Sequence, residues 1–277
     1  RDFARERVQG SAENPVTIIN HPDVRRMLLT MKSTVEAMRG LIYDVVSSLD
    51  VARAHPETEA RRAARIRADL LTPVVKAWCT DMGVEVTSLG VQVHGGMGYM
   101  EETGAVQHWR DSRIAPIYEG TNGIQAIDLA TRKVQRDSGD AVAHYATEIR
   151  TVLAALESET DTISASLHTH LAAALDTLET ATQWLVTDAI DTPEKVLAGA
   201  TPYLRLFGLT AGGVIMARSA LAAGKELVDG EDDVGFYTSK RRTAHFYAEN
   251  ILSQAVALLA PIRDGHESII VFPEDQF

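Results

Sequence analysis

The chain has 277 residues, with 27 Lys and Arg against 38 Asp and Glu, and a formal net charge of −11 at pH 7. Hydrophobic residues make up 45% of the sequence, which is enough for a sizeable core and argues against intrinsic disorder. The acidic balance argues against broad binding to nucleic acid or anionic membranes, because the long-range electrostatic force would be repulsive. Nine prolines and few aromatic residues favour an α-helical protein.

The single cysteine, Cys79, excludes an internal disulfide and a four-cysteine metal cluster. A reducing compartment fits this composition, and we expect a cytoplasmic protein with no membrane span, because no run approaches the roughly 18 apolar residues that a span needs. The chain begins at Arg1 instead of methionine, so we expect it to be a piece of a longer protein.

Two long amphipathic helices are predicted in the first part of the chain. Apolar residues recur at steps of three and four from Pro22 to about Leu49, which indicates one helix of roughly 40 Å. A similar pattern follows His55-Pro56 and continues to Val93, where Pro73 should kink the helix or mark a junction. Helices of this length need long partners, which predicts an antiparallel helical bundle.

The next stretch joins this pair to the second part of the chain. The glycines of His94–Gly98 predict a loop, and a short helix is expected around Gly104–Trp109. Glu119 lies in a loop that leads into a helix, whose apolar spacing resumes at Ile124. The polar stretch of residues 136–140 is the best candidate for a domain boundary.

The second part of the chain also has helical periodicity. The expected elements are helices at Ala141–Leu156, Ile163–Ile190, Leu204–Leu227 and Val234–Leu259, and a strand or packed tail at Ile269–Phe272. Thr192 and Pro193 have the chemistry of a helix start, Pro202 should interrupt the segment that follows, and the small residues of Ala211–Gly213 and Ala220–Gly224 suit close helix contacts. The predicted fold is all-α: a long antiparallel helical bundle in residues 1–137 and a second helical domain in residues 138–277.

Several enzymatic signatures are excluded by their spacing. Lys225 is not preceded by a phosphate-binding loop, because Ser219 stands where the glycine is required. The glycines of Gly95–Gly98 lack the dinucleotide-binding spacing and a strand-helix-strand context. No Glu-x-x-His pair occurs, so a di-iron site has no support and no metal site is predicted. Glu119 alone would be interpreted as a helix-entry carboxylate followed by the capping residue Thr121.

Three ordered segments change that interpretation. They read Gln-Val-His-Gly-Gly-Met-Gly-Tyr at residues 92–99, Trp-Arg-Asp-Ser-Arg-Ile at 109–114, and Tyr-Glu-Gly-Thr-Asn-Gly-Ile-Gln at 118–125. Together they resemble the C-terminal signature of the acyl-CoA dehydrogenase flavoproteins. His21-Pro22 and Met27 to Met31 resemble the start of that family's C-terminal helical domain. Residues after about Asp137 resemble the extra helical domain of the larger bacterial members.

The resemblance implies an FAD-dependent desaturation of an acyl-CoA thioester. Glu119 would be the base that removes the α proton, while a flavin accepts hydride from the β-carbon. The backbone N–H of Glu119 would polarise the thioester carbonyl, and Gly120 would let the main chain approach the substrate because it has no side chain. A base held at the α-carbon is needed because a thioester α proton is weakly acidic.

The resemblance also assigns residues to the cofactor. Gln92, Val93, His94, Gly95 and Gly96 resemble the strip that lies against the flavin dinucleotide of a neighbouring subunit. For His94, a helix-ending histidine that is satisfied by backbone is an equally good interpretation.

Further cofactor contacts are implied on both sides of this strip. Thr121, Asn122 and Gly123 resemble the segment that borders the dinucleotide after the base. Arg7 resembles the arginine that pairs with the flavin pyrophosphate, with Arg5 as a competing candidate because the spacing to Gly10 is one residue short.

Two other positions carry no assigned chemistry. Pro22 stands where many members of the family have a glutamine. Arg110-Asp111 is interpreted as a structural ion pair.

The implied partners are an acyl-CoA substrate, an electron-transfer flavoprotein that accepts the electrons, and further copies of the chain in a homodimer or homotetramer. In family terms, an N-terminal helical domain and a middle β domain would precede Arg1, so this chain alone should bind flavin weakly and turn over little. Two alternatives remain: an acyl-CoA oxidase, and a non-catalytic helical assembly or nucleic-acid-associated relative. A carboxylate at Glu119 disfavours the non-catalytic relative, and the acidic charge disfavours DNA.

Overall fold

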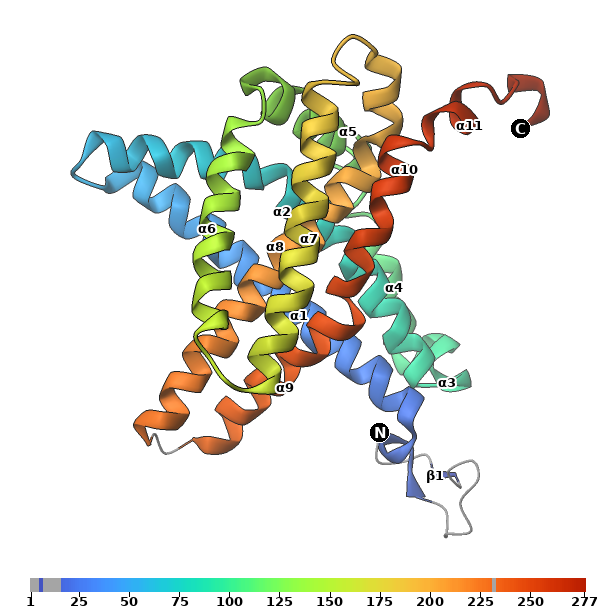
Figure 1. Cartoon of the computed structure of the whole chain (residues 1–277). Helices are drawn as coiled ribbons and strands as arrows, with labels where there is room; N and C mark the ends of the chain where they lie inside the picture. The colour runs from blue at the N-terminus through green and yellow to red at the C-terminus, as the bar shows by residue number, and fades with distance from the viewer. Residues whose placement is uncertain (1–4, 7–15, 231–232) are drawn as a thin grey trace.

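A computed structural model of the chain describes residues 5–6, 16–230 and 233–277. These residues are almost entirely helical, which confirms the all-α prediction (Figure 1). The exception is an antiparallel pair of two-residue strands, β1 (Arg5–Glu6) and β2 (Val16–Thr17), which the sequence pattern did not predict. A short 3-10 turn, η1 (Ile18–Asn20), leads from β2 into the first helix.

The predicted pair of long helices is present as an antiparallel hairpin. Helix α1 (Pro22–Ala54) begins with proline in its first turn, where the missing N–H has no intrahelical partner to lose, and α2 (Thr58–Val93) returns alongside it. Helix α2 continues through Pro73, so the expected junction at this residue is absent. The apolar stripe of α1 packs inward, and Leu41 and Val45 are buried in the core.

The connection from α2 to the second half contains several short elements. They are α3 (Gly96–Tyr99), η2 (Glu101–Thr103), α4 (Ala105–Ser112), α5 (Asn122–Ile127), the π-helix η3 (Asp128–Val134) and η4 (Gln135–Asp137). The predicted glycine loop after His94 is therefore only partly a loop, because α3 makes one helical turn there. The predicted helix start after Glu119 is confirmed by α5.

The second half contains four main helices and a short C-terminal run of helical turns. The elements are α6 (Asp140–Glu157), α7 (Thr162–Val186), α8 (Pro193–Asp229), α9 (Val234–Asn250), η5 (Leu252–Leu258), α10 (Leu259–Arg263), α11 (His266–Ile270) and η6 (Glu274–Gln276).

Three sequence predictions in this half are wrong. Helix α7 ends before the expected Ile190, and α8 continues through Pro202, because the fully buried Tyr203 and Phe207 pack the helix into the core. Residues 269–272 form neither a strand nor a packed tail. The short helix α11 projects from the bundle at the upper right of Figure 1, with Val271 73% exposed.

Helix α8 lies at the centre of the fold and contacts α1, α2, α7 and α9. Among the described residues it is the one helix long and apolar enough, by length and composition, to cross a membrane, and 78% of its apolar window is buried inside the protein. The predicted small-residue surface is confirmed at Gly212, where a Cβ would lie 2.3 Å from Oη of Tyr247 and 2.9 Å from Cη2 of Trp78. Gly208, which the prediction did not include, makes the closest approach to α2, since a Cβ there would lie 2.2 Å from Cγ of Trp78. The glycines therefore allow the close approach of two large helices.

The hydrophobic core is continuous across the two halves of the chain. Trp78 of α2 and Tyr145 of α6 belong to the same buried cluster as Phe207 of α8, and the rings of Tyr145 and Phe207 stack with centroids 5.7 Å apart. The division into two domains near residue 137 stays a prediction, because the two halves share this core.

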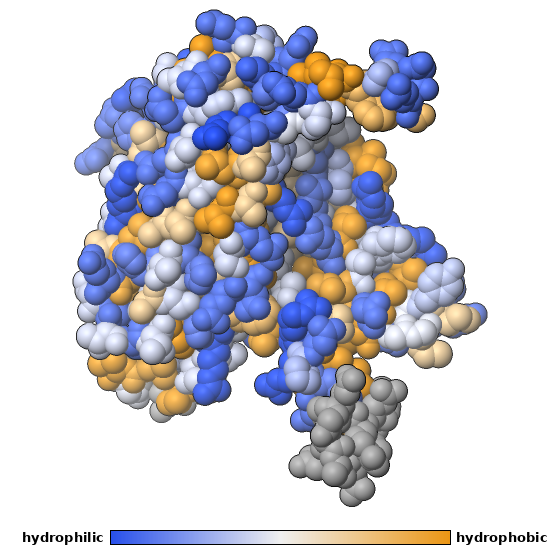
Figure 2. Space-filling view, turned by 45° about the vertical axis from the view of Figure 1, so that its right-hand side comes forward, coloured by the Kyte–Doolittle hydropathy of each residue, from blue (hydrophilic) through white to orange (hydrophobic). Residues whose placement is uncertain are grey.

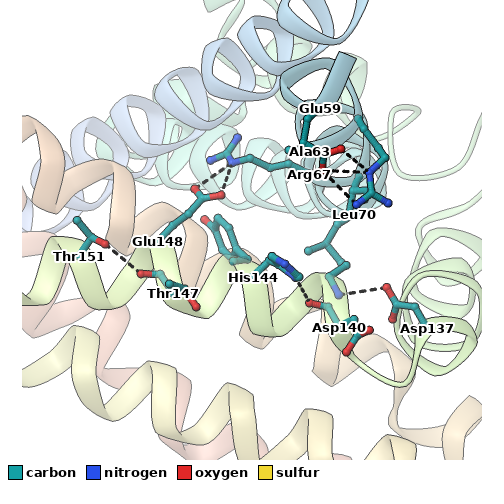
Figure 3. Close-up of a pocket in the computed structure, with 14 residues that line it drawn as sticks. Glu59, Ala63, Arg67, Leu70, Asp137, Asp140, His144, Thr147, Glu148 and Thr151 are labelled. Carbon is teal, nitrogen blue, oxygen red and sulfur yellow. Dashed lines mark hydrogen bonds and ion pairs between the residues drawn. The ribbon is translucent and has the colours of Figure 1, made fainter. Parts of the chain in front are cut away.

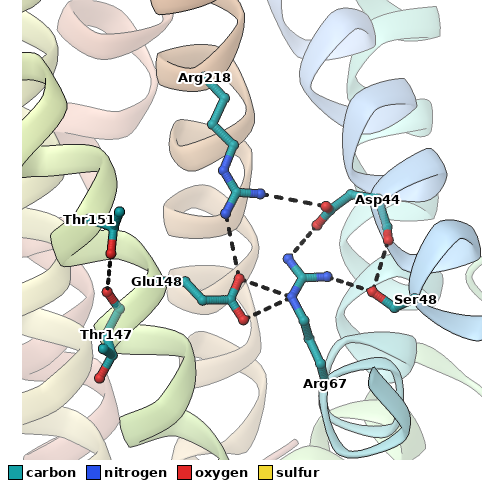
Figure 4. Close-up of polar contacts among 7 residues, drawn as sticks. All are labelled: Asp44, Ser48, Arg67, Thr147, Glu148, Thr151 and Arg218. Carbon is teal, nitrogen blue, oxygen red and sulfur yellow. Dashed lines mark hydrogen bonds and ion pairs between the residues drawn. The ribbon is translucent and has the colours of Figure 1, made fainter. Parts of the chain in front are cut away.

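A polar cluster joins four helices beside this core (Figure 4). The guanidinium of Arg67 on α2 is only 15% exposed; it lies 2.6 Å from Asp44 of α1 and 3.0 Å from Glu148 of α6. It also donates a hydrogen bond to Ser48, and Arg218 of α8 lies 3.5 Å from both carboxylates. Because each of these half-buried charges has more than one partner, the cluster locks the hairpin onto the second half.

Candidate active site

Glu119 lies on a tight turn between α4 and α5. Its φ is 53° and that of Gly120 is 84°, so two successive residues adopt the left-handed conformation that is costly for a residue with a Cβ. Thr121 ends the turn as the N-cap of α5, with its hydroxyl accepting the N–H of Ile124 at 3.3 Å. The predicted placement of the glutamate before a helix start is confirmed.

The carboxylate of Glu119 faces solvent. The residue is exposed and makes no hydrogen bond or ion pair with any residue that the structure describes. Large apolar side chains surround the turn, and Ile117, Tyr118 and Ile124 are each at least half exposed. Figure 2 shows apolar patches between the polar residues of the molecule's surface. A cover over Ile117, Tyr118 and Ile124 would remove water from the glutamate.

The side chain of Asn122 points inward, toward the middle of α2. Its Oδ1 accepts a hydrogen bond from Nζ of Lys76 at 2.8 Å, and its Nδ2 donates to Oδ1 of Asp81 at 2.7 Å and to the carbonyl of Ala77 at 3.0 Å. Thr80 also lies within hydrogen-bonding distance, at 2.9 Å from Nδ2. The sequence interpretation missed Lys76, Thr80 and Asp81. The feature that could have indicated them is the group of polar residues that they form within a largely apolar stretch of the helix.

Residues 121–123 border an open cleft of about 480 Å³ between α2 and the Glu119 turn. Asp81 and Glu85 of α2 form one wall, with Arg205 of α8 beside them. Arg205 pairs with Glu85 at 3.0 Å. Arg113 lies on the opposite side of the cleft and has no ion pair among the described residues. Thr121 and Gly123 are therefore accessible to a ligand, whereas the amide of Asn122 is already used.

The second predicted segment lies at the far end of α2. Gln92, His94, Gly95 and Gly96 are exposed and Val93 is half-buried. Nδ1 of His94 lies 2.7 Å from the carbonyl of Gly90, which is the backbone-satisfied arrangement; its contact with a flavin stays a prediction.

Gly95 has φ 63° and ψ −149°, a conformation essentially restricted to glycine, and a Cβ there would meet open space. The backbone of this segment is thus bare, which suits close approach by a ligand.

Both predicted segments lie along α2 within one chain. The cleft that residues 121–123 border reaches Glu85, which is about 10 Å from Gln92 along the axis of α2. A ligand that uses both segments must therefore be long, whether it binds one chain or lies between two.

Two sequence assignments concern arginines. Arg110 pairs with Glu101 at 2.6 Å, not with Asp111, so the predicted partner is wrong: the helix α4 directs Arg110 back across η2. Arg7 lies outside the described residues. For Arg5, only the backbone, in β1, is described.

A separate cavity lies elsewhere in the described part of the chain. It has a volume of about 730 Å³ and lies between α2 and the first turns of α6, where Arg67, Leu70, His144 and Tyr145 line it (Figure 3). None of the predicted site residues contributes to its wall. No group of three or more His, Cys, Asp and Glu side chains in the described part of the chain is arranged to hold a metal ion.

Comparisons with known proteins agree with this architecture. The family model described as "Acyl-CoA dehydrogenase, C-terminal domain" matches residues 2–134, and the one described as "Acetyl-CoA dehydrogenase C-terminal like" matches residues 131–273. The fold is that of the helical C-terminal part of a dehydrogenase. The chain belongs to the acyl-CoA dehydrogenase family.

The chain is also similar to full-length members of this family. The 3-methylmercaptopropionyl-CoA dehydrogenase of Ruegeria pomeroyi is 42% identical over 97% of this chain and 46% of that protein. The chain thus spans about half the length of the curated relatives it matches.

Two structures share the fold. Caenorhabditis elegans ACDH-11 in complex with C11-CoA has a TM-score of 0.66 and 19% identity, over 92% of this chain and 39% of that one. An acyl-CoA dehydrogenase complexed with FAD from Bacillus anthracis has a TM-score of 0.63 and 16% identity, over 94% and 44%.

Proposed function

We propose that this chain is the C-terminal portion of an FAD-dependent acyl-CoA dehydrogenase and that Glu119 is the base of the reaction. The observation that carries the proposal is an exposed carboxylate without a partner among the described residues, on a left-handed turn at a helix start, in a chain of this family. A carboxylate that is already paired would have to break that pair before it could accept a proton. Glu119 has no such contact to break.

The reaction is an α,β-desaturation. Glu119 takes the α proton of the thioester, the electrons of that C–H bond form the new double bond, and hydride leaves the β-carbon. When bound, FAD supplies the hydride acceptor. The backbone N–H of Glu119 makes no hydrogen bond with the described residues, so it is available to donate to the thioester oxygen as negative charge develops there.

The chain's own residues fit a dinucleotide in two places. Gly95 and Gly96 present bare backbone at the end of α2, and Thr121 and Gly123 border the cleft beside the base. Because residues 92–96 resemble the family's strip that lies against the flavin of a neighbouring subunit, we infer that one FAD borders Glu119 of one subunit and residues 92–96 of another. This arrangement requires a homodimer or homotetramer.

The substrate is an acyl-CoA, and we propose that an electron-transfer flavoprotein takes up the electrons. The name of the Ruegeria pomeroyi relative makes 3-methylmercaptopropionyl-CoA the first thioester to try, alongside straight-chain acyl-CoAs of increasing length. An enzyme that instead passes electrons directly to oxygen would consume oxygen without any added acceptor.

The test uses the full-length flavoprotein with a panel of thioesters. With an artificial electron acceptor, the wild type should convert at least one acyl-CoA to a product lighter by two hydrogens, as seen by mass spectrometry. Glu119→Gln should lower this rate by roughly 10²–10⁴-fold, the usual contribution of a general base. Glu102→Gln is the matched control, since the Glu102 side chain is exposed and makes no hydrogen bond or ion pair with the described residues. Normal turnover by Glu119→Gln would overturn the proposal.

A further inference from the structure

The turn that carries Glu119 is fastened to α2 on both sides of the glutamate. Nζ of Lys76 donates to the carbonyl of Ala115 at 3.1 Å, four residues before Glu119, and to Oδ1 of Asn122 at 2.8 Å, three residues after it. The backbone N–H of Asn122 also donates to the carbonyl of Pro116 at 3.0 Å, which closes the loop on itself. One ammonium group therefore bridges the start and the end of the loop.

Lys76 and Asn122 together form a clamp that holds the Glu119 turn on α2. Besides accepting from Lys76, the amide of Asn122 donates to Asp81 at 2.7 Å and to the carbonyl of Ala77 at 3.0 Å. Its oxygen and nitrogen are thus both bound to α2, and α2 is a long helix packed against α1 and α8. The position of the loop is therefore set by a long helix that is packed on two sides.

The clamp also explains the backbone of Glu119. A glutamate with φ 53° adopts a conformation that non-glycine residues keep only when their surroundings hold it. The carboxylate itself does not hold the turn, because it makes no hydrogen bond or ion pair with the described residues. The restraint comes from the flanking anchors, Ala115 and Asn122.

We propose that Lys76 and Asn122 are positioning residues for the base: they fix the turn so that the Glu119 carboxylate is aimed at one point above the protein surface. The inference rests on the proposed function of Glu119. It also changes the role of Asn122, whose side chain holds the loop instead of contacting the cofactor. Lys76 and Asn122 touch neither substrate nor cofactor in this account.

A positioning role predicts a specific kinetic signature. A misplacement of the reacting groups by about 1 Å costs roughly 10²-fold in rate, so Lys76→Met in the full-length flavoprotein should slow the bleaching of the flavin by acyl-CoA about 100-fold. KM should not change, because Lys76 does not bind the thioester. Asn122→Ala should give the same loss. The double variant should be no slower than either single variant, because both residues act through one clamp.

Lys133→Met is the matched control. Lys133 is half-buried like Lys76, but it makes no hydrogen bond or ion pair with the described residues. Its variant should bleach at the wild-type rate. Asn122→Ser provides a milder change that keeps a hydroxyl too short to reach Asp81, and it should also slow bleaching while the flavin absorbance confirms a folded site.

A second readout does not depend on activity. In this chain, Lys76→Met should speed amide hydrogen exchange at residues 115–122 and leave exchange in α1 and α8 unchanged. The proposal is overturned if Lys76→Met and Asn122→Ser bleach at the wild-type rate, or if they raise KM without slowing bleaching. These outcomes differ from failure of the proposed function, in which Glu119→Gln itself would stay active.

Discussion

The crossing of α2 and α8 gives a stability prediction that can be worked out from the structure. A Cβ on Gly208 would lie 2.2 Å from Cγ, 2.4 Å from Cδ1 and 2.7 Å from Cβ of Trp78. Trp78 is 1% exposed and sits in the core, so neither the ring nor the helix can move aside freely. The substitution Gly208→Ala therefore overpacks this crossing.

Two effects of opposite sign set the magnitude. Overpacking a core costs about 1–3 kcal/mol, and alanine regains up to about 1 kcal/mol of helix propensity over glycine. Because the new Cβ would clash with three atoms of Trp78 at once, we expect an overpacking cost near the upper end of this range. The net loss in the free energy of unfolding should be about 2 kcal/mol. The control is Gly224→Ala on the same helix, where the nearest atom belongs to Arg241 at 3.7 Å, an ordinary contact.

Thermal unfolding followed by far-ultraviolet circular dichroism measures both variants. At roughly 2–4 °C per kcal/mol for a chain of this size, Gly208→Ala should lower Tm by several degrees and Gly224→Ala should raise it slightly. Equal shifts for the two variants would refute the reasoning, because helix propensity alone would then account for them and the close crossing would be unnecessary.

Three further predictions concern single side chains. Burial raises the pKa of the Cys79 thiol to about 12, so at pH 8 thiol reagents should label the folded chain about a thousandfold more slowly than the unfolded chain; equal rates would contradict this. Asp161 caps α7, and although burial opposes it, hydrogen bonds from Ser164 and Arg241 lower its pKa to about 2. The stabilisation by Asp161 is thus present above its ordinary pKa of 3.8 and lost as pH falls through 2. Asp161→Ala should lower the free energy of urea unfolding by about 1 kcal/mol at pH 7, and no difference at neutral pH would argue against the cap. Arg67→Met should lower the free energy of unfolding by about 3 kcal/mol, because Asp44 and Glu148 would then share one cation, Arg218, at 3.5 Å; a neutral effect would show that the cluster does not lock the helices.

The helical fold was predictable because its signals are local. Steps of three and four between apolar residues locate α1, α2 and α6, and the glycines of α8 indicate the close crossing with α2. The errors arise where packing overrides local preference. Pro202 costs a backbone hydrogen bond, yet the buried residues after it keep α8 continuous. The apolar run at residues 269–272 indicates burial, but here it is exposed.

The position of the candidate site was predictable from the sequence, but the hydrogen bonds that hold its turn on α2 were not. The glycine after Glu119 and the threonine after that predict a turn at a helix start, which the structure contains. The direction of the Asn122 side chain was not predictable, because its partners on α2 are more than 40 residues away in the sequence. Contacts of this kind depend on how the loop docks, and helical periodicity carries no information about docking.

The central claim is that the carboxylate of Glu119 removes a proton from carbon next to a thioester. Anaerobic mixing of the full-length flavoprotein with its acyl-CoA, followed by flavin absorbance in a single turnover, tests it most directly. The account predicts that Glu119→Gln keeps the yellow flavin and does not bleach, while Glu102→Gln bleaches like the wild type. Full, rapid bleaching of Glu119→Gln would contradict it and leave another group as the base.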